Sequence, residues 1–164
     1  MISIIIPVYN EELVIRQSVF ALNNYLLSLN LVAEIILINN GSTDKTEEVC
    51  KELLSENTII KLHTLPFRSV GKAFARGVQV AKFNFIISLD ADLSSNLTFI
   101  EQCVDLLHDY DVVIGSKVLG LQRRSYLRVI ASQTYIAISQ ALFGLTVSDF
   151  SIGCKGYRRE SISP

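Results

Sequence analysis

Two carboxylates, Asp90 and Asp92, follow a run of apolar residues and are separated by a single alanine. The run Asn84–Leu89 predicts a buried strand, so both carboxylates emerge where that strand ends. In an open parallel sheet, ligands bind at the carboxyl ends of the strands. Paired carboxylates suit Mg²⁺ or Mn²⁺, which proteins hold with one or two such groups plus substrate phosphates. The spacing therefore predicts a metal site, unless Asp92 or one of the serines after it simply caps the next helix.

Two other loops carry polar side chains directly after expected strands. The first strand runs into Pro7–Glu12, and the second ends in Asn39–Thr46, where Gly41 permits a tight turn. Taken alone, each is an ordinary connection between a strand and a helix. Together with the paired carboxylates, they place polar groups at three strand ends on one rim. This layout predicts a nucleotide pocket, in which Tyr9 is available to stack on a base.

The sequence contains neither of the two common glycine-rich phosphate loops. Gly71 and Lys72 lack the preceding pattern of a P-loop, and no G-x-G-x-x-G occurs. A bound diphosphate would therefore depend on metal and fixed cations. Lys72 is one candidate to approach the nucleotide, and the alternative is that it belongs to an exposed basic helix face.

Short apolar runs alternate with longer helical patterns along the chain. The expected strands are Ile2–Ile6, Glu34–Ile38, Thr58–Leu62, Asn84–Leu89 and Asp111–Gly115, with a further one possible at Gly153–Arg158. The expected helices are Glu11–Leu29, Thr43–Ser55, Ser69–Lys82 and Ser95–His108. This alternation predicts an α/β fold with a mainly parallel sheet and helices on both faces. Residues 1–164 contain no linker or repeat and predict one domain, which we expect to be truncated because another helix is expected to start near Pro164.

The composition narrows the class of protein. With 49% hydrophobic and 19% charged residues among 164, the chain is not a disordered tail, and its net charge of −1 gives no reason to expect nucleic-acid binding. Cys50, Cys103 and Cys154 lack any Cys-x-x-Cys spacing and predict reduced, buried thiols in a cytosolic protein. No run of 18 apolar residues is unbroken, so no transmembrane helix is expected.

The segment 122–145 begins with basic residues and continues as an apolar stripe at helical spacing. Such a stripe usually faces the core. The alternative is a helix lying in a membrane interface, with its arginines on anionic headgroups, which would also account for the high mean hydropathy of +0.36. An uncovered stripe would instead support self-association into a homo-oligomer.

Four motifs, in order across nearly the whole chain, resemble the family-two inverting glycosyltransferases, which have a GT-A (Rossmann-like) fold. They are Ile4–Glu11, Asn40–Asp44, Gly71–Ala73 with Gly77, and Asp90–Asp92. Within that family the chain is similar to polyprenyl-phosphate hexosyltransferases such as the dolichyl-phosphate mannose and glucose synthases. The residues that carry this finer likeness are Gly115–Lys117, Arg128 with Ser132, and Asp149–Gly153 leading to Tyr157 and Arg158.

The resemblance assigns roles to individual positions. It implies that Pro7, Tyr9 and Glu11 line a nucleoside site, and that Asp90 and Asp92 hold Mg²⁺ or Mn²⁺ against the donor diphosphate. Catalytic roles fall to Asp92, Asp149 and Arg128, and the remaining expected substrate-binding residues are Asn40, Ser42, Lys72, Lys117, Ser132 and Arg158. Asn40 stands where the family commonly has an aspartate.

The implied donor is a nucleotide-diphosphate sugar of the UDP-glucose or GDP-mannose type, and the implied acceptor is a lipid phosphate. A lipid phosphate is largely ionised at neutral pH and needs no strong general base. A glycan or other hydroxyl acceptor would need one, for which Asp149 is the candidate. A third hypothesis is a non-catalytic nucleotide-sugar-binding module. A lipid acceptor would place the protein peripherally on the cytoplasmic face of a membrane.

Overall fold

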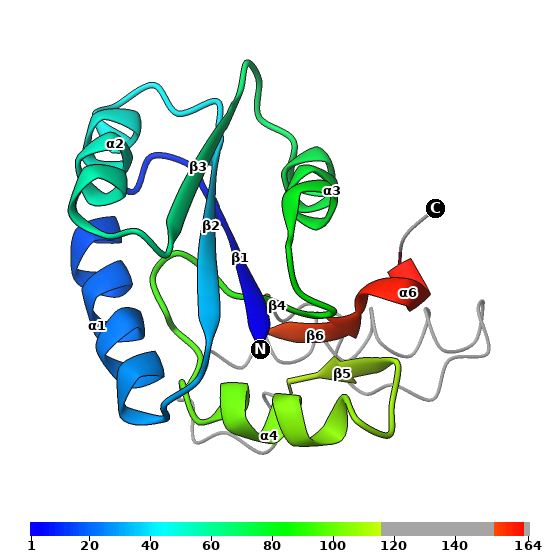
Figure 1. The fold of residues 1–164 in the computed structure, drawn as a ribbon. Helices are drawn as coiled ribbons and strands as arrows, with labels where there is room; N and C mark the ends of the chain where they lie inside the picture. The colour runs from blue at the N-terminus through cyan, green and yellow to red at the C-terminus, as the bar shows by residue number, and fades with distance from the viewer. Residues whose placement is uncertain (116–152, 163–164) are drawn as a thin grey trace, which may run out of the picture. The chain divides into compact units, whose positions relative to one another are not determined.

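The computed structural model describes residues 1–115 and 153–162. Residues 1–113 and 153–162 belong to one compact unit, drawn in colour in Figure 1. Its elements are β1 (Ile2–Val8), α1 (Ile15–Ser28), β2 (Ala33–Asn40), α2 (Thr46–Glu56), β3 (Ile60–Leu65), α3 (Val70–Val80), β4 (Phe85–Ser88), α4 (Phe99–Leu106), β5 (Val112–Ile114), β6 (Lys155–Arg158) and α6 (Arg159–Ile162).

Six strands form one sheet in the order β3-β2-β1-β4-β6-β5. β1 pairs in parallel with β2 and with β4, and β2 pairs in parallel with β3. β6 is antiparallel to β4, with Ser88 opposite Lys155 and Phe85 opposite Arg158. The predicted mainly parallel α/β sheet is confirmed, and the last expected strand enters it next to β4 rather than at an edge.

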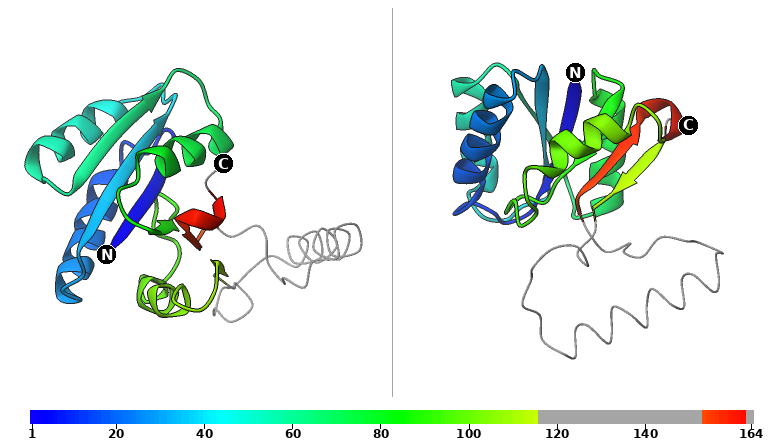
Figure 2. Two further views of the ribbon diagram at one scale, coloured as in Figure 1. Left: turned by 45° about the vertical axis from the view of Figure 1, so that its right-hand side comes forward. Right: turned by 90° about the horizontal axis from the view of Figure 1, so that it is seen from below.

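Helices cover both faces of this sheet. α1 and α2 lie on one face and α3 lies on the other, as the views in Figures 1 and 2 agree. α4 joins the face of α1, where the hydroxyl of Tyr25 donates a hydrogen bond to Glu101. The prediction of a two-sided sheet is therefore confirmed.

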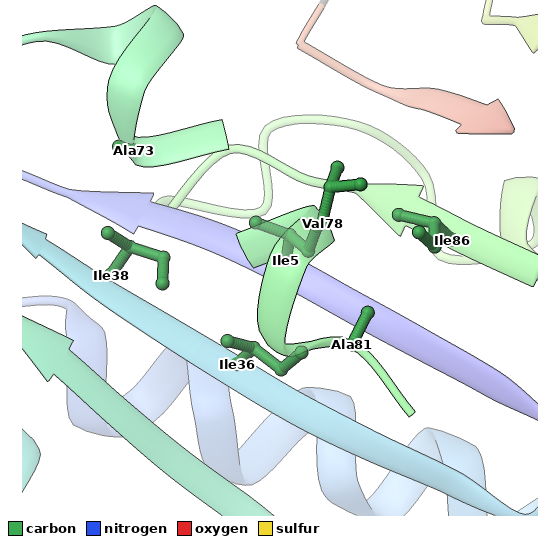
Figure 3. Close-up of a cluster of buried hydrophobic side chains, with 7 residues drawn as sticks. All are labelled: Ile5, Ile36, Ile38, Ala73, Val78, Ala81 and Ile86. Carbon is green, nitrogen blue, oxygen red and sulfur yellow. The ribbon is translucent and has the colours of Figure 1, made fainter. Parts of the chain in front are cut away.

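Burial on both faces explains why β1 and β2 are almost continuously apolar. Ile4, Ile5 and Ile6 are consecutive in β1 and are all fully buried. One cluster fills the space between the sheet and α3 (Figure 3), and it consists of Ile5, Ile36, Ile38, Ala73, Val78, Ala81 and Ile86. α3 packs closely at Gly77, where an added Cβ would lie 2.5 Å from a side-chain carbon of Ile5.

Three helices begin three or four residues later than the sequence pattern predicts, and α3 begins one residue later, at Val70. α1 begins at Ile15 rather than Glu11, α2 at Thr46 rather than Thr43, and α4 at Phe99 rather than Ser95. In the first two cases, polar loop residues bond to the opposite loop instead of starting a helical ladder. For example, the amide of Lys45 donates to a carboxylate oxygen of Glu12 at 2.8 Å.

All three cysteines are free and buried. Burial raises the pKa of Cys50, Cys103 and Cys154 to about 12, so the thiols stay protonated at neutral pH. This confirms the expectation of buried reduced thiols. Among residues 1–115 and 153–162, no helix combines the length and hydropathy that crossing a bilayer requires.

Candidate active site at the carboxyl edge of the sheet

A cavity of about 560 Å³ lies at the edge where β1, β2 and β4 end. The loops after β1 and β4 line it, together with the last residue of β2, the β3–α3 loop, the start of α3 and β6. The lining residues are Pro7, Val8, Tyr9, Glu11, Asn40, Arg68, Val70, Gly71, Phe74, Ser88, Leu89, Asp90, Ala91, Asp92, Ser94, Gly153, Lys155 and Tyr157. The three polar loops therefore meet at one rim, as the sequence indicates.

The loops after β1 and β2 are joined to each other by hydrogen bonds. Asn10 has a left-handed backbone with φ of 56°, and its side-chain oxygen accepts a bond from the amide of Thr43 at 2.8 Å. The amide of Glu11 donates to the hydroxyl of Thr46 at 2.7 Å, which fixes the chain direction before α1. These bonds hold Glu11 beside the cavity.

The β3–α3 loop is held against the end of β2. Asn40 is 2% exposed, and its side-chain oxygen accepts a bond from the amide of Ser69 at 2.6 Å. Gly41 has a φ of 73°, and a Cβ there would lie 2.8 Å from the carbonyl carbon of Phe67. The hydrogen bond to Asn40 and the close approach to Gly41 hold the β3–α3 loop in place, which brings Arg68 to the cavity.

Arg68 covers one face of Tyr9. Its guanidinium carbon lies 4.1 Å from the centre of the tyrosine ring, which is cation–π geometry. Arg68 is not among the site residues predicted from the sequence. Its position just after the third expected strand could have predicted it, because all parallel strands of a sheet end at the same edge.

The paired carboxylates lie on a compact turn after β4. The amide of Leu93 donates to the carbonyl of Asp90 at 3.1 Å, and the amide of Ser94 donates to the Asp92 carboxylate at 2.9 Å. Both aspartates are exposed at the cavity. α4 begins only at Phe99, so the alternative in which Asp92 caps that helix is wrong.

Negative charge is concentrated on this side of the cavity. Burial raises the pKa of Glu11, and the nearby charges of Asp92 and Asp44 raise it further. The Asp90 and Asp92 carboxylates are hard oxygen donors of the kind that Mg²⁺ and Mn²⁺ prefer. Within residues 1–115 and 153–162, no group of three or more acidic, histidine or cysteine side chains is arranged to hold a metal ion, so an ion bound here would also need substrate oxygens.

In the part of the chain that the structure describes, residues 1–115 and 153–162, Arg68 and Lys155 are the cations that line the cavity. Lys155 begins β6 and lies opposite Ser88 of β4. Lys155 is not among the site residues predicted from the sequence, although it falls inside the last expected strand, Gly153–Arg158. The structure thus supplies positive charge from the β3–α3 loop and from β6.

Three residues expected to bind substrate lie away from the cavity lining. Ser42 braces the loops, since its hydroxyl accepts a bond from the amide of Asn10 at 3.1 Å. The ammonium of Lys72 lies 4.6 Å from the centre of the Phe67 ring. Arg158 lies at the opposite end of β6, where its Nε donates to the carbonyl of Leu107 at 2.7 Å. This separation follows from the strand register, which sends Arg158 away from the rim and brings Lys155 to it.

Several predicted residues lie outside the described part of the chain. They are Lys117, Arg128, Ser132 and Asp149, together with the basic and apolar segment 122–145.

The family model of glycosyl transferase family 2 matches residues 3–163. The chain belongs to this family. An undecaprenyl-phosphate 4-deoxy-4-formamido-L-arabinose transferase from Aeromonas hydrophila is 30% identical over 99% of this chain and 50% of its own length. An uncharacterised glycosyltransferase from Synechocystis is 32% identical over 84% of this chain and 46% of its own length. This family 2 chain therefore spans about half the length of the curated relatives it matches.

Solved structures show the same GT-A fold. A glucosyl-3-phosphoglycerate synthase from Mycobacterium tuberculosis, in complex with Mn²⁺, uridine diphosphate and phosphoglyceric acid, superposes with a TM-score of 0.72 at 23% identity, covering 98% of this chain and 56% of that one. A mannosyltransferase from Pyrobaculum calidifontis, in complex with GDP-mannose and Mn²⁺, gives a TM-score of 0.67 at 18% identity over 97% of this chain and 44% of that one.

Proposed function

We propose that this family 2 domain transfers a hexose from a nucleotide-diphosphate sugar to a polyprenyl phosphate, with inversion at C1. The observation that carries the proposal is the cavity at the carboxyl edge, which combines carboxylates, cations and an aromatic ring. The likeness to an undecaprenyl-phosphate sugar transferase supports the lipid acceptor. Solved structures with the same fold that hold uridine diphosphate or GDP-mannose together with Mn²⁺ support a donor of the UDP-glucose or GDP-mannose type.

Asp90 and Asp92 would hold Mg²⁺ or Mn²⁺ in this proposal. The fit rests on their placement, because both carboxylates are exposed on one turn and line the cavity next to Glu11. The bound cation would supply Lewis-acid stabilisation of the negative charge on the leaving diphosphate.

Arg68 and Lys155 would bind the phosphates of the donor or the acceptor. Arginine offers a planar fork that can make two hydrogen bonds to one phosphate, whereas lysine acts as a point charge. Pro7, Tyr9, Glu11 and Asn40 would surround the nucleoside. Lys117, Arg128 and Ser132 stay proposed phosphate-binding residues.

The acceptor oxygen would attack C1 from the face opposite the diphosphate, so the bond from C1 to the diphosphate breaks as the new bond forms. A phosphate with a second pKa of about 6 is mostly ionised at neutral pH, so no strong base is required. The site must then hold two anionic substrates close together, and fixed cations would offset the repulsion between them. Docking on the cytoplasmic face of a membrane through segment 122–145 completes the proposal.

A transfer assay with labelled UDP-glucose or GDP-mannose, Mn²⁺ and a short polyprenyl phosphate tests this function. We expect label to move to the lipid only when metal and lipid phosphate are both present. Transfer to a sugar alcohol but not to the lipid would favour the hydroxyl-acceptor alternative and a role for Asp149 as base. Metal-dependent nucleotide binding without transfer or hydrolysis would favour the non-catalytic module.

A further inference from the structure

Gly153, which precedes β6, lies directly against the carboxylate of Asp90. A Cβ added at Gly153 would fall 1.9 Å from one carboxylate oxygen of Asp90 and 2.3 Å from its carboxyl carbon. Real Cβ atoms do not approach other atoms so closely, so no side chain fits at this position while the carboxylate keeps its place.

The strand register explains the contact. Ser88 is opposite Lys155 in the antiparallel pair of β4 and β6, and continuing this register by two residues sets Gly153 opposite Asp90.

We infer that Gly153 is a positioning residue for Asp90, and this inference rests on the proposed function. Gly153 lies two residues before Lys155, the first residue of β6 that pairs with β4, whereas the Asp90 carboxylate is the end of a short side chain with two rotatable bonds. A methyl group at position 153 would therefore displace the carboxylate rather than the sheet. The missing Cβ reserves the space in which Asp90 is held at the cavity beside Asp92.

Ser55→Ala offers a control outside the cavity. Ser55 is exposed in α2 and does not line the cavity, so this small change leaves the Asp90 carboxylate in place.

The experiment measures Mn²⁺ binding to the 164-residue chain in the presence of UDP or GDP, using the electron paramagnetic resonance signal of free Mn²⁺. We expect Gly153→Ala to weaken Mn²⁺ binding about tenfold or more, as loss of a supporting contact to a metal ligand does. Ser55→Ala should bind Mn²⁺ like the wild type. Wild-type Mn²⁺ affinity in Gly153→Ala would overturn the inference.

A stability cycle tests the contact independently of metal. Urea unfolding is compared for the wild type, Asp90→Ala, Gly153→Ala and the double variant. Because Asp90→Ala empties the contested space, we expect Gly153→Ala to cost less stability in that background than in the wild type. Equal costs would overturn the inference. If the wild type binds no Mn²⁺ with either nucleotide, the proposed function fails, and the cycle still decides whether Gly153 and Asp90 share this space.

Discussion

The guanidinium of Arg68 lies 4.1 Å from the centre of the Tyr9 ring. The two residues come from the loops after β3 and β1, and both line the cavity at the carboxyl edge. Arg68 thus covers one face of Tyr9, so a nucleobase would stack on the other face or take the place of the guanidinium. The stacking of a base on Tyr9 stays a prediction, and Arg68 limits which face of the ring is free for it.

Arg68→Ala should weaken the binding of UDP or GDP in the presence of Mn²⁺ by about tenfold, which corresponds to about 1.4 kcal/mol. The reason is that a cation at the cavity would make charge-assisted hydrogen bonds to the diphosphate. Isothermal titration calorimetry measures the effect. Arg68→Lys should recover only part of the affinity because lysine lacks the planar fork.

Arg76→Ala is the matched control for Arg68. Arg76 is exposed on α3 and does not line the cavity, so its removal changes net charge equally without changing the site. An equal loss of affinity in both variants would show a general charge effect and contradict a direct contact with Arg68.

Asp92→Asn should abolish the metal-dependent part of nucleotide binding while leaving the fold intact. Asparagine keeps an oxygen that can accept the bond from the Ser94 amide, so the unliganded stability should change by about 0.5 kcal/mol or less. Wild-type protein at a hundredfold excess of ligand over its dissociation constant should gain about 2.7 kcal/mol. Thermal unfolding with and without Mn²⁺ measures both quantities.

The control for Asp92 is Asp105→Asn, at an exposed position of α4 that does not line the cavity. It should keep the full metal-dependent stabilisation. Unchanged metal dependence in Asp92→Asn would argue against the proposed site.

Glu34→Gln should destabilise the protein by about 2 kcal/mol at neutral pH. Glu34 is 5% exposed in β2, accepts a bond from the hydroxyl of Ser3 at 2.6 Å, and pairs with the ammonium of Lys61 at 2.6 Å. Glutamine keeps the shape but loses the charge that these donors face. Urea unfolding at pH 7 measures the loss, and Glu48→Gln, at an exposed position of α2, should have almost no effect.

Protonation of Glu34 should contribute to the loss of folding stability at acidic pH. Burial alone would raise the pKa of Glu34, but hydrogen bonds from Lys61, Ser3 and the Lys82 amide outweigh it and hold the pKa below its ordinary value of 4.5. Its stabilising effect is therefore complete above pH 4.5 and is lost as the pH falls through the lower native value. Stability measured from pH 7 downward should fall less steeply in Glu34→Gln, and parallel curves would contradict this assignment.

Gly156→Ala should destabilise the packing of β6 on α4 by about 1–3 kcal/mol. A Cβ at Gly156 would lie 2.0 Å from the sulfur of Cys103, which is fully buried. Cys103→Ala removes that sulfur, so the double variant should be more stable than the sum of the two single effects predicts. Simple additivity in urea unfolding would contradict the clash.

The order of strands and helices could be predicted from the sequence because a strand buried on both faces requires a continuous run of apolar residues. Continuous apolar runs such as Ile2–Ile6 identify parallel strands wherever they later pair. The starts of α1 and α2 lie later than predicted because their loop residues find partners about 30 positions away, as Asn10 does with Thr43. Such bonds leave no periodic pattern in the chain.

The sequence by itself determined the α/β class, the buried thiols and the placement of the Asp90–Asp92 turn at a strand end. These follow from composition and from local periodicity. Only the tertiary structure decided which cations reach the cavity, since it brings Arg68 and Lys155 to the rim and sends Arg158 to the far end of β6. The physical reason is that strand register and loop packing depend on pairings between distant residues, and a shift of one residue would reverse which side chains face the site.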